Sequence, residues 1–276
     1  MSRLPPLTPM AVIGLLGASA FVLLAAFAPW LAPHPVSDVV GGVWDPPSAN
    51  ALLGTDNIGR DLFSRLVWGA RVTFVIAALS TAIAFLLGVL LGFYAAVRGG
   101  WIDQVLSRLN DLMMAIPTLI FALVVLAVLP KTMVVLVLVM ATLEATRVFR
   151  VSRAIAADLV VLDYVEVARL RGESWRWVIL REILPNALSP LLAELGLRFA
   201  FAILFLSTLS FLGLGVQPPI ADWGSLVKEN KDGLLFGVFA ALIPGAAIAI
   251  LVICINLVVD WMLQKTTSLK GTRRNG

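Results

Sequence analysis

Long apolar runs alternate with short polar stretches along most of this chain. An α-helix needs about 20 apolar residues to cross a hydrocarbon core of ~30 Å, and the runs approach or exceed that length. The pattern therefore predicts an all-α integral membrane protein. The six expected membrane-spanning helices cover residues 10–31, 73–97, 112–129, 132–149, 186–215 and 236–262.

The region around the second span carries two further patterns. Within residues 53–71, Leu62 and Leu66 share one helical face and polar side chains occupy the other, which predicts a helix lying at the membrane interface. Gly88 and Gly92, four residues apart in the span itself, form a small-xxx-small pair that lets a neighbouring helix approach closely. Chance spacing explains the glycine pair equally well from the sequence alone.

The most polar part of the chain is the stretch Leu159–Pro185, between the fourth and fifth spans. It holds seven charged side chains between Glu166 and Glu182. Because a central Arg or Asp costs roughly 2.5–3.5 kcal/mol in a membrane helix, this stretch must lie in water on one side of the membrane.

Two short helices are predicted within this stretch. The first has an apolar stripe that ends at Gly172, since glycine is favoured just beyond a helix C-terminus. The second contains Trp175, Val178 and Ile179 and is closed by Pro185. Apolar and aromatic side chains among arginines are typical of a protein docking surface. A hairpin that packs beneath its own bundle explains the pattern equally well, so both interpretations stay open.

The distribution of Lys and Arg among the predicted loops indicates the orientation. Six spans place both termini on the same side as the stretch 159–185. That side holds 14 Lys and Arg residues and the opposite side holds six. Cytoplasmic loops carry the excess of positive charge, so both termini and the stretch 159–185 are expected in the cytoplasm.

Composition supports a membrane protein and excludes several other classes. Apolar residues make up 60% of the chain and charged residues 14%, with a mean hydropathy of +0.96, which leaves no length for a separate soluble domain. The net charge of +4 reflects the loop bias and does not indicate nucleic-acid binding. His34 and Cys254 are the single histidine and cysteine, so the chain has no internal disulfide and no thiol or imidazole metal cage.

Four polar residues of the fifth span are candidates for a role inside the membrane. Glu194 and Arg198 are four residues apart, in the favourable order for an ion pair, and ionisable residues within a span are functional candidates by default. Ser207 and Ser210 follow on the same span. These residues either line a pore or brace the helices against one another.

The stretch 159–185 also contains a more specific pattern. Glu166-Val167-Ala168, then Gly172, then Leu184-Pro185 resembles the EAA loop of permease subunits in binding-protein-dependent ABC importers. The match departs from that pattern at Val167, where alanine is usual, and at Glu182, where isoleucine is usual. Three other stretches resemble the dipeptide, oligopeptide and nickel permeases, namely residues 53–71, residues 209–219 and Asp222-Trp223-Gly224.

The resemblance implies a fold and a set of coupling residues. The fold would be the six-helix permease architecture of type I ABC importers, with a cytoplasmic coupling helix. Residues 1–71 would form an N-terminal membrane helix and a periplasmic or interfacial segment, residues 72–265 the permease domain, and residues 266–276 a cytoplasmic tail. The coupling loop would use Glu166, Ala168, Gly172, Ser174, Trp175, Val178, Ile179, Leu184 and Pro185.

The resemblance also implies partners in a bacterial inner membrane. They are a homologous second permease, with this chain as the second of the pair, two ABC ATPases and an extracytoplasmic substrate-binding protein, all within or against lipid. No G-x-x-x-x-G-K-[ST] run is present, so ATP and magnesium are expected on the ATPases and this chain is not expected to be an enzyme. Di- and oligopeptides are the expected substrates.

Other substrates and one other class of protein remain open. Nickel or metal chelates, opines, glutathione and antimicrobial peptides would suit the same machinery. A stand-alone secondary transporter is the alternative from another class, although it usually shows internal repeats and ionisable residues at mid-membrane.

Overall fold

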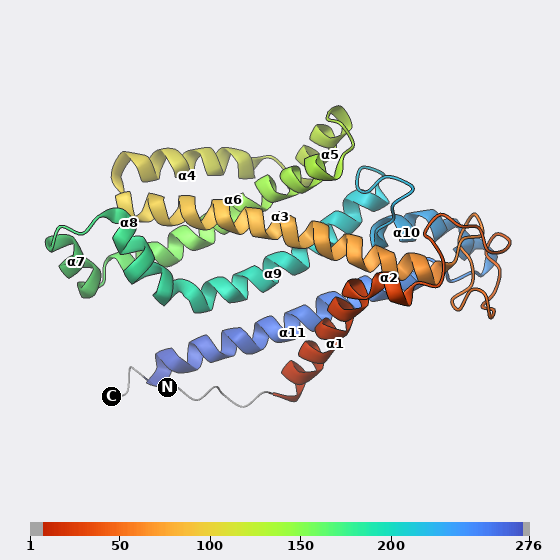
Figure 1. The fold of residues 1–276 in the computed structure, drawn as a ribbon. Helices are drawn as coiled ribbons and strands as arrows, with labels where there is room; N and C mark the ends of the chain where they lie inside the picture. The colour runs from red at the N-terminus through yellow and green to blue at the C-terminus, as the bar shows by residue number, and fades with distance from the viewer. Residues whose placement is uncertain (1–7, 273–276) are drawn as a thin grey trace.

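The computed structural model of the protein describes residues 8–272, with side chains as far as Leu263, and this part of the chain is mostly helical (Figure 1). In chain order the elements are α1 (Pro9–Ala26), α2 (Ala28–Leu31), α3 (Leu62–Arg98), α4 (Gly100–Ala115), α5 (Thr118–Val128), α6 (Met133–Val160), α7 (Asp163–Leu170), α8 (Trp175–Trp177), the π-helical η1 (Val178–Ile183), α9 (Leu184–Phe211), α10 (Trp223–Asn230), the 3₁₀-helical η2 (Lys231–Phe236) and α11 (Leu242–Thr272).

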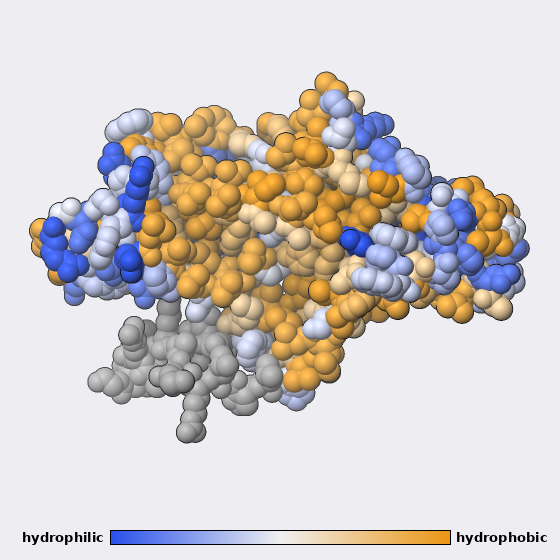
Figure 2. All heavy atoms as spheres, viewed as in Figure 1, coloured by the Kyte–Doolittle hydropathy of each residue, from blue (hydrophilic) through white to orange (hydrophobic). Residues whose placement is uncertain are grey.

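The long helices form a bundle with two distinct ends. The helix α7 lies at one end, and α10 lies at the other together with the loop 32–61 that precedes α3 (Figure 1). These are called the α7 end and the α10 end below. Between them the surface is predominantly apolar, whereas both ends are rich in hydrophilic residues (Figure 2). This distribution is the one expected of a bundle surrounded by lipid.

Length and composition support four or five membrane crossings, where the sequence pattern predicted six. Four helical segments are long and apolar enough, and a fifth crossing arises if the bent pair α4 and α5 counts as one span. The helix α6 has the length, but Glu144, Arg147 and Arg150 interrupt its apolar run. The four segments are Pro9–Ala26, Leu62–Arg98, Trp175–Phe211 and Leu242–Leu263.

The predicted third span, residues 112–129, is too short, because helical structure begins earlier. The charged residues 98–111 do not form a link: the helix α4 begins at Gly100, returns along α3 and meets α5 at 81° (Figure 1). The bend falls at Ile116 and Pro117, where the residue before a proline is disfavoured in helical conformation. Charged and apolar residues alternate along α4, so the sequence has no continuous apolar run that would predict this helix.

The predicted helix before the second span is present and is continuous with that span. The helix α3 runs unbroken from Leu62 to Arg98 and is about 55 Å long at 1.5 Å per residue. The carboxylate of Asp61 caps its N-terminus by accepting hydrogen bonds from the backbone N–H groups of Phe63 and Ser64. Because α3 is longer than a hydrocarbon core of ~30 Å, it also forms part of the α10 end.

The glycine pair of α3 is a packing site, as one of the two interpretations predicted. A Cβ on Gly88 would lie 2.6 Å from Cβ of Val148, and one on Gly92 would lie 2.8 Å from the backbone oxygen of Phe149. The hydroxyl of Ser152 also donates to the backbone oxygen of Gly88 at 2.9 Å. The backbones of α3 and α6 therefore approach too closely for any side chain here.

The final span begins later than predicted. Residues 231–236 form η2, which ends at Gly237 with a φ of +74°, and α11 starts at Leu242 rather than at Phe236. The expected tail 266–276 begins inside α11, which continues to Thr272, and residues 273–276 lie outside the described part.

A buried ion cluster fastens the loop 32–61 to α10. The carboxylate of Asp56 pairs with Arg60 at 2.6 Å and with Arg65 at 2.5 Å, and both arginines also pair with Glu229 of α10, at 2.7 and 2.5 Å. The side chains of Asp56 and Arg65 are almost wholly buried. Asn230 adds a further link, since its side-chain oxygen accepts from the indole N–H of Trp44.

This cluster keeps Asp56 ionised. Burial raises the pKa of Asp56, but backbone N–H donors of Arg60 and Ile58 and the charges of Arg65 and Arg60 together outweigh that effect, so the pKa lies below its usual value of 3.8. The α10 end is thus held by charges that are present at neutral pH.

Candidate functional site

The predicted polar stretch 159–185 forms the α7 end. The helix α6 ends at Val160, α7 follows after a short turn, and a second turn leads into α8, η1 and α9 (Figure 1). The expected pair of short helices is therefore present, with one difference: the second is continuous with the next membrane helix.

The turn after α7 depends on Gly172. Its φ is +78°, its N–H donates to the oxygen of Arg169, and the N–H of Glu173 donates to the oxygen of Ala168. These two bonds form the Schellman arrangement that ends many helices at glycine. A Cβ at Gly172 would meet no atom within 4 Å, so the constraint on this residue is conformational and not steric.

The second half of the loop packs beneath its own bundle. Val178 is fully buried and Ile179 nearly so, in a cluster that also contains Phe93 and Val97 of α3. Trp175 stacks edge-to-face on Tyr94 with 4.9 Å between ring centroids. Val178 and Ile179, two of the implied coupling residues, therefore pack on α3 and present little or no surface. Their implied part in coupling stays a prediction.

Pro185 does not close the second helix, in contrast to the prediction. The helical segment Trp175–Phe211 passes through it without a break. The N–H of Leu184 donates to the oxygen of Ile179, a π-type bond in the turn just before the proline. Such a turn lets the helix accommodate the missing N–H and the ring of Pro185.

The first half of the loop faces outward. Ala168 and Val165 are buried and hold α7 against the bundle, whereas Leu170 is 81% exposed and Val167 is 53% exposed. Glu166 is exposed, and its carboxylate has no hydrogen bond or ion pair among the described residues. Ser174 caps α8 by accepting from the N–H of Trp177, and Leu184 and Pro185 lie at the start of α9.

The candidate pair Glu194 and Arg198 belongs to a larger charged cluster inside the bundle. Arg198 pairs with Glu194 at 2.8 Å and with Glu144 of α6 at 3.3 Å, and Glu144 also pairs with Arg147 at 3.0 Å. Arg147 reaches α5 as well, by donating to the hydroxyl of Thr118. The cluster links α5, α6 and α9, and Glu144 is only 2% exposed.

The two candidate serines make local contacts. The hydroxyl of Ser207 donates to the backbone oxygen of Ile203, and the hydroxyl of Ser210 accepts from the N–H of Val216. A Cβ on Gly224 would lie 2.4 Å from the backbone oxygen of Ser207, so α10 packs directly on α9 here. Both serines are buried and fix the start of the α10 end.

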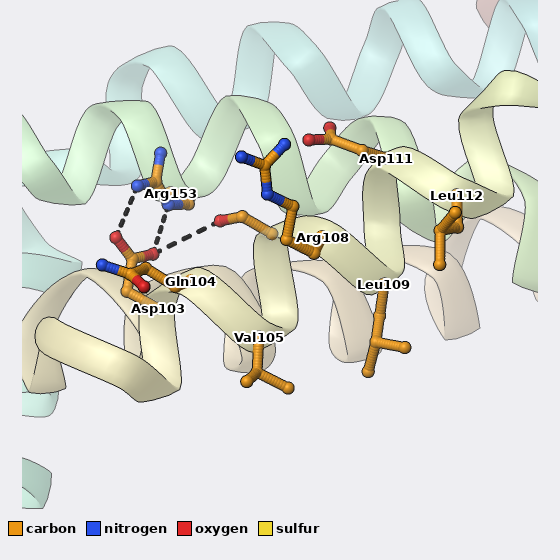
Figure 3. Close-up of a pocket in the computed structure, with 9 residues that line it drawn as sticks. Asp103, Gln104, Val105, Arg108, Leu109, Asp111, Leu112 and Arg153 are labelled. Carbon is orange, nitrogen blue, oxygen red and sulfur yellow. Dashed lines mark hydrogen bonds and ion pairs between the residues drawn. The ribbon is translucent and has the colours of Figure 1, made fainter.

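Two ion pairs between α4 and α6 were missed by sequence reasoning. Arg153 pairs with Asp103 (Figure 3). Arg150 pairs with Asp111 at 3.0 Å. The partners lie 50 and 39 residues apart in the sequence. The spacing of Asp103 and Asp111, eight residues apart, was the available signal, since it places both carboxylates on one face of a helix.

These features define the class of protein. Charged side chains within an apolar bundle face its interior or a water-filled cavity, and they commonly mark the paths of ions and solutes. A bundle with this interior and with one outward-facing helix at its polar end has the organisation of a multi-pass transport protein.

Comparison with known proteins gives the family. Residues 88–266 match the family model of the binding-protein-dependent transport system inner membrane component. Residues 8–51 match that of the N-terminal membrane domain of oligopeptide transport permease C. The chain therefore belongs to the family of binding-protein-dependent inner-membrane permeases, and it is a permease of the ABC transporter type.

Individual relatives cover most of the chain. The di/tripeptide transport permease of Pseudomonas aeruginosa is 36% identical over 258 residues, which are 90% of this chain and 85% of the relative. The dipeptide transport permease of Haemophilus influenzae is 33% identical over 261 residues, 91% and 87% of the two chains. The glutathione transport permease of Pectobacterium atrosepticum is 31% identical over 249 residues, 88% and 83%.

Proposed function

We propose that this chain forms half of the translocation pore of an ATP-driven importer for di- and oligopeptides. The observation that carries the proposal is the family membership combined with the exposed surface of α7. The helix presents Leu170 and Val167 to solvent, at the position where the family-like pattern begins with Glu166. A homologous second permease would form the other half of the pore.

The proposed arrangement has six crossings. They are α1 with α2, α3, the bent pair α4 and α5, α6, α9 and α11. The charges of α6 do not oppose a crossing, because Glu144, Arg147, Arg150 and Arg153 all pair with other described side chains. With the positive loops inside, the α7 end and both termini lie in the cytoplasm and the α10 end faces the periplasm.

The proposed mechanism divides the chemistry among subunits. Two ABC ATPases bind ATP and magnesium, and one of them receives α7. Closure of the ATPase pair moves α7 and thereby favours one access state of the pore, since only contacts that differ between two states can shift their equilibrium. A substrate-binding protein delivers the solute at the α10 end. The permease itself performs no hydrolysis.

The proposed substrates are short peptides, and glutathione is the second candidate. Relatives named for dipeptides, for di- and tripeptides and for glutathione all cover most of the chain. Glutathione is itself a tripeptide, so a pore suited to one would suit the others. The two candidates are separated by the ligand that the cognate binding protein retains on purification.

The docking proposal is tested by crosslinking in the assembled complex. Leu170→Cys at the α7 end is matched by Leu235→Cys at the α10 end, because the two leucines are 81% and 84% exposed. Leu170→Cys should crosslink to an ATPase subunit and Leu235→Cys should not. The reverse result would show that the proposed orientation is inverted.

Transport itself is tested in proteoliposomes that hold both permeases, with and without the ATPases. Uptake of a labelled dipeptide should require ATP, the ATPases and the binding protein. Uptake by the permeases alone would instead establish a secondary transporter.

A further inference from the structure

A groove of about 700 Å³ runs along α4, and Arg153 of α6 contributes to its lining (Figure 3). One edge is charged and includes Asp103, Arg108 and Asp111 of α4 with Arg153 of α6. The other edge is apolar and is formed by Val105, Leu109 and Leu112. In the close-up, the charged side chains point toward α6 and the three apolar side chains point away from it.

With Arg98, at the end of the second span, taken as the inner edge of the hydrocarbon core, the Asp111 end of the groove lies at membrane depth. Asn110 of α4 lines a second cavity, of about 240 Å³, together with Gly88 of α3 and Phe149 of α6. Asp111 and Arg150, the sequence neighbours of Asn110 and Phe149, are therefore close to the level of Gly88. That level is 10 residues from the end of α3 at Arg98, or about 15 Å along a helix. This distance is half the thickness of a hydrocarbon core of ~30 Å.

The charges of the groove are incompatible with contact to lipid. Asp111 of the groove is 51% exposed, and its ion-pair partner Arg150, which lies beside the groove, is 59% exposed. At mid-membrane each charge would cost roughly 2.5–3.5 kcal/mol against lipid on insertion scales. Charged residues at this depth face the interior of a bundle or a water-filled cavity. The groove must therefore face water or a partner.

The buried cluster around Glu144 differs from the groove in this respect. Its central residues pair across α6 and α9, with Glu144 at 2% and Arg198 at 11% exposed, so these two have little surface left for a solute, whereas Arg147 at its edge is 35% exposed. The pair of Asp111 and Arg150 is open on its outer side. An exposed ion pair contributes only about 0–1 kcal/mol, so a solute can separate the two groups at low cost.

We propose that this groove lines the water-filled path by which the solute crosses the inner half of the membrane, and that it suits solutes with separated positive and negative charges. The inference rests on the proposed function and adds the residues of the path. A short peptide carries an ammonium group, a carboxylate and side chains of varied polarity. Asp111 of the groove matches the first group, and its ion-pair partner Arg150, which lies beside the groove, matches the second. The edge of Val105, Leu109 and Leu112 accommodates apolar side chains.

Thiol labelling in the assembled complex tests the groove. In a Cys254→Ala background, Gln104→Cys and Arg108→Cys replace exposed residues of the groove. Leu86→Cys is the matched control, because Leu86 is 61% exposed on α3 at nearly the level of Gly88 and outside the groove. The probe is a charged, membrane-impermeant methanethiosulfonate reagent, added from the α7 side of oriented vesicles.

The expected result is that both groove cysteines react at least tenfold faster than Leu86→Cys, and that their modification lowers ATP-dependent dipeptide uptake at least fivefold. Two results would overturn the inference. Groove cysteines as unreactive as Leu86→Cys would mean that a partner helix covers the groove. Reactive cysteines whose modification leaves uptake unchanged would mean a wet crevice away from the path.

The labelling readout keeps this inference separate from the proposed function. Thiol reactivity is measured without transport. If the Cys254→Ala complex bound its ATPases but showed no ATP-dependent uptake, the importer proposal would fail, and slow labelling of Gln104→Cys and Arg108→Cys would then separately refute a water-filled groove.

Discussion

At the α10 end, two buried arginines share two carboxylates and fasten the loop 32–61 to α10. At the α7 end, one short helix rests on Val165 and Ala168, with Arg169 donating to the backbone oxygen of Val97, and its other side chains are exposed. The charged groups of the α10 end pair with one another within the chain. At the α7 end, Leu170 and the carboxylate of Glu166 have no partners among the described residues. The contrast supports the proposal that one end is a preformed face and that the other is a docking surface for another subunit.

The largest effect is expected from Arg65→Ala. Removing this side chain leaves the buried Asp56 with one arginine fewer, and breaking a buried ion pair typically costs 3–5 kcal/mol. The thermal midpoint of the purified complex should fall sharply. Lys231→Ala is the control, because Lys231 pairs with Asp232 in solvent and should change the free energy of unfolding by about 0.5 kcal/mol or less. Equal shifts in the two variants would show that the cluster does not hold the α10 end.

A smaller effect is expected from Gly172→Ala at the α7 end. An L-residue in left-handed conformation costs about 1–2 kcal/mol, and no steric clash adds to this cost. Hydrogen exchange in α7 should become faster, and stimulation of ATP hydrolysis by substrate should decline, while the midpoint of the whole bundle changes little.

Gly172→Asn provides the control for this prediction, since asparagine tolerates positive φ better than alanine. It should retain more coupling than Gly172→Ala. If both variants coupled as well as the wild type, the turn would have no part in transmission.

Protonation of Asp56 is a milder perturbation of the α10 end, because it removes one charge and leaves both arginines in place. Since the folded-state pKa lies below the ordinary 3.8, the stabilisation is fully present above that pH and is lost as the pH falls through the lower folded value. The thermal midpoint should therefore show no contribution from this group between pH 7 and 4. Arg60→Gln should reduce the loss seen in more acidic solution, and an unaltered acid profile in that variant would contradict the assignment.

The smallest effect on stability is expected from Leu170→Ser. The side chain is exposed in this chain, so the free energy of unfolding should change by about 0.5 kcal/mol or less. Binding of the ATPase subunits, measured by co-purification, should nevertheless weaken several-fold. A variant that lost stability and kept its ATPases would reverse the roles assigned to the two ends.

The fold was predictable where apolar runs are continuous. The first, second, fifth and sixth spans are present because their lipid-facing residues are apolar along their whole length. The helix α4 was interpreted as a link because Asp103, Arg108 and Asp111 interrupt its pattern. In α6 the charges find partners on other helices, which no local pattern reveals.

The candidate site shows the same division between local and distant causes. The stop at Gly172 could be predicted, since a positive φ is a property of the backbone at that residue. The burial of Val178 and Ile179 could not, because an apolar side chain in a polar loop looks the same whether it packs on its own bundle or on a partner. The cluster of Glu144 with Arg198 joins residues 54 positions apart.

The unbroken helix from Trp175 to Phe211 has a consequence for alternating access. Arg198, held to α6, lies about 35 Å from the first residue and about 20 Å from the last at 1.5 Å per residue. If the helix pivots there, a tilt of ~10° displaces its inner tip by ~6 Å and its outer tip by ~3 Å in the opposite sense, from the same geometry. Tilting of this one rigid helix would then close one end of the pore as it opens the other, without any separate signal between the two ends.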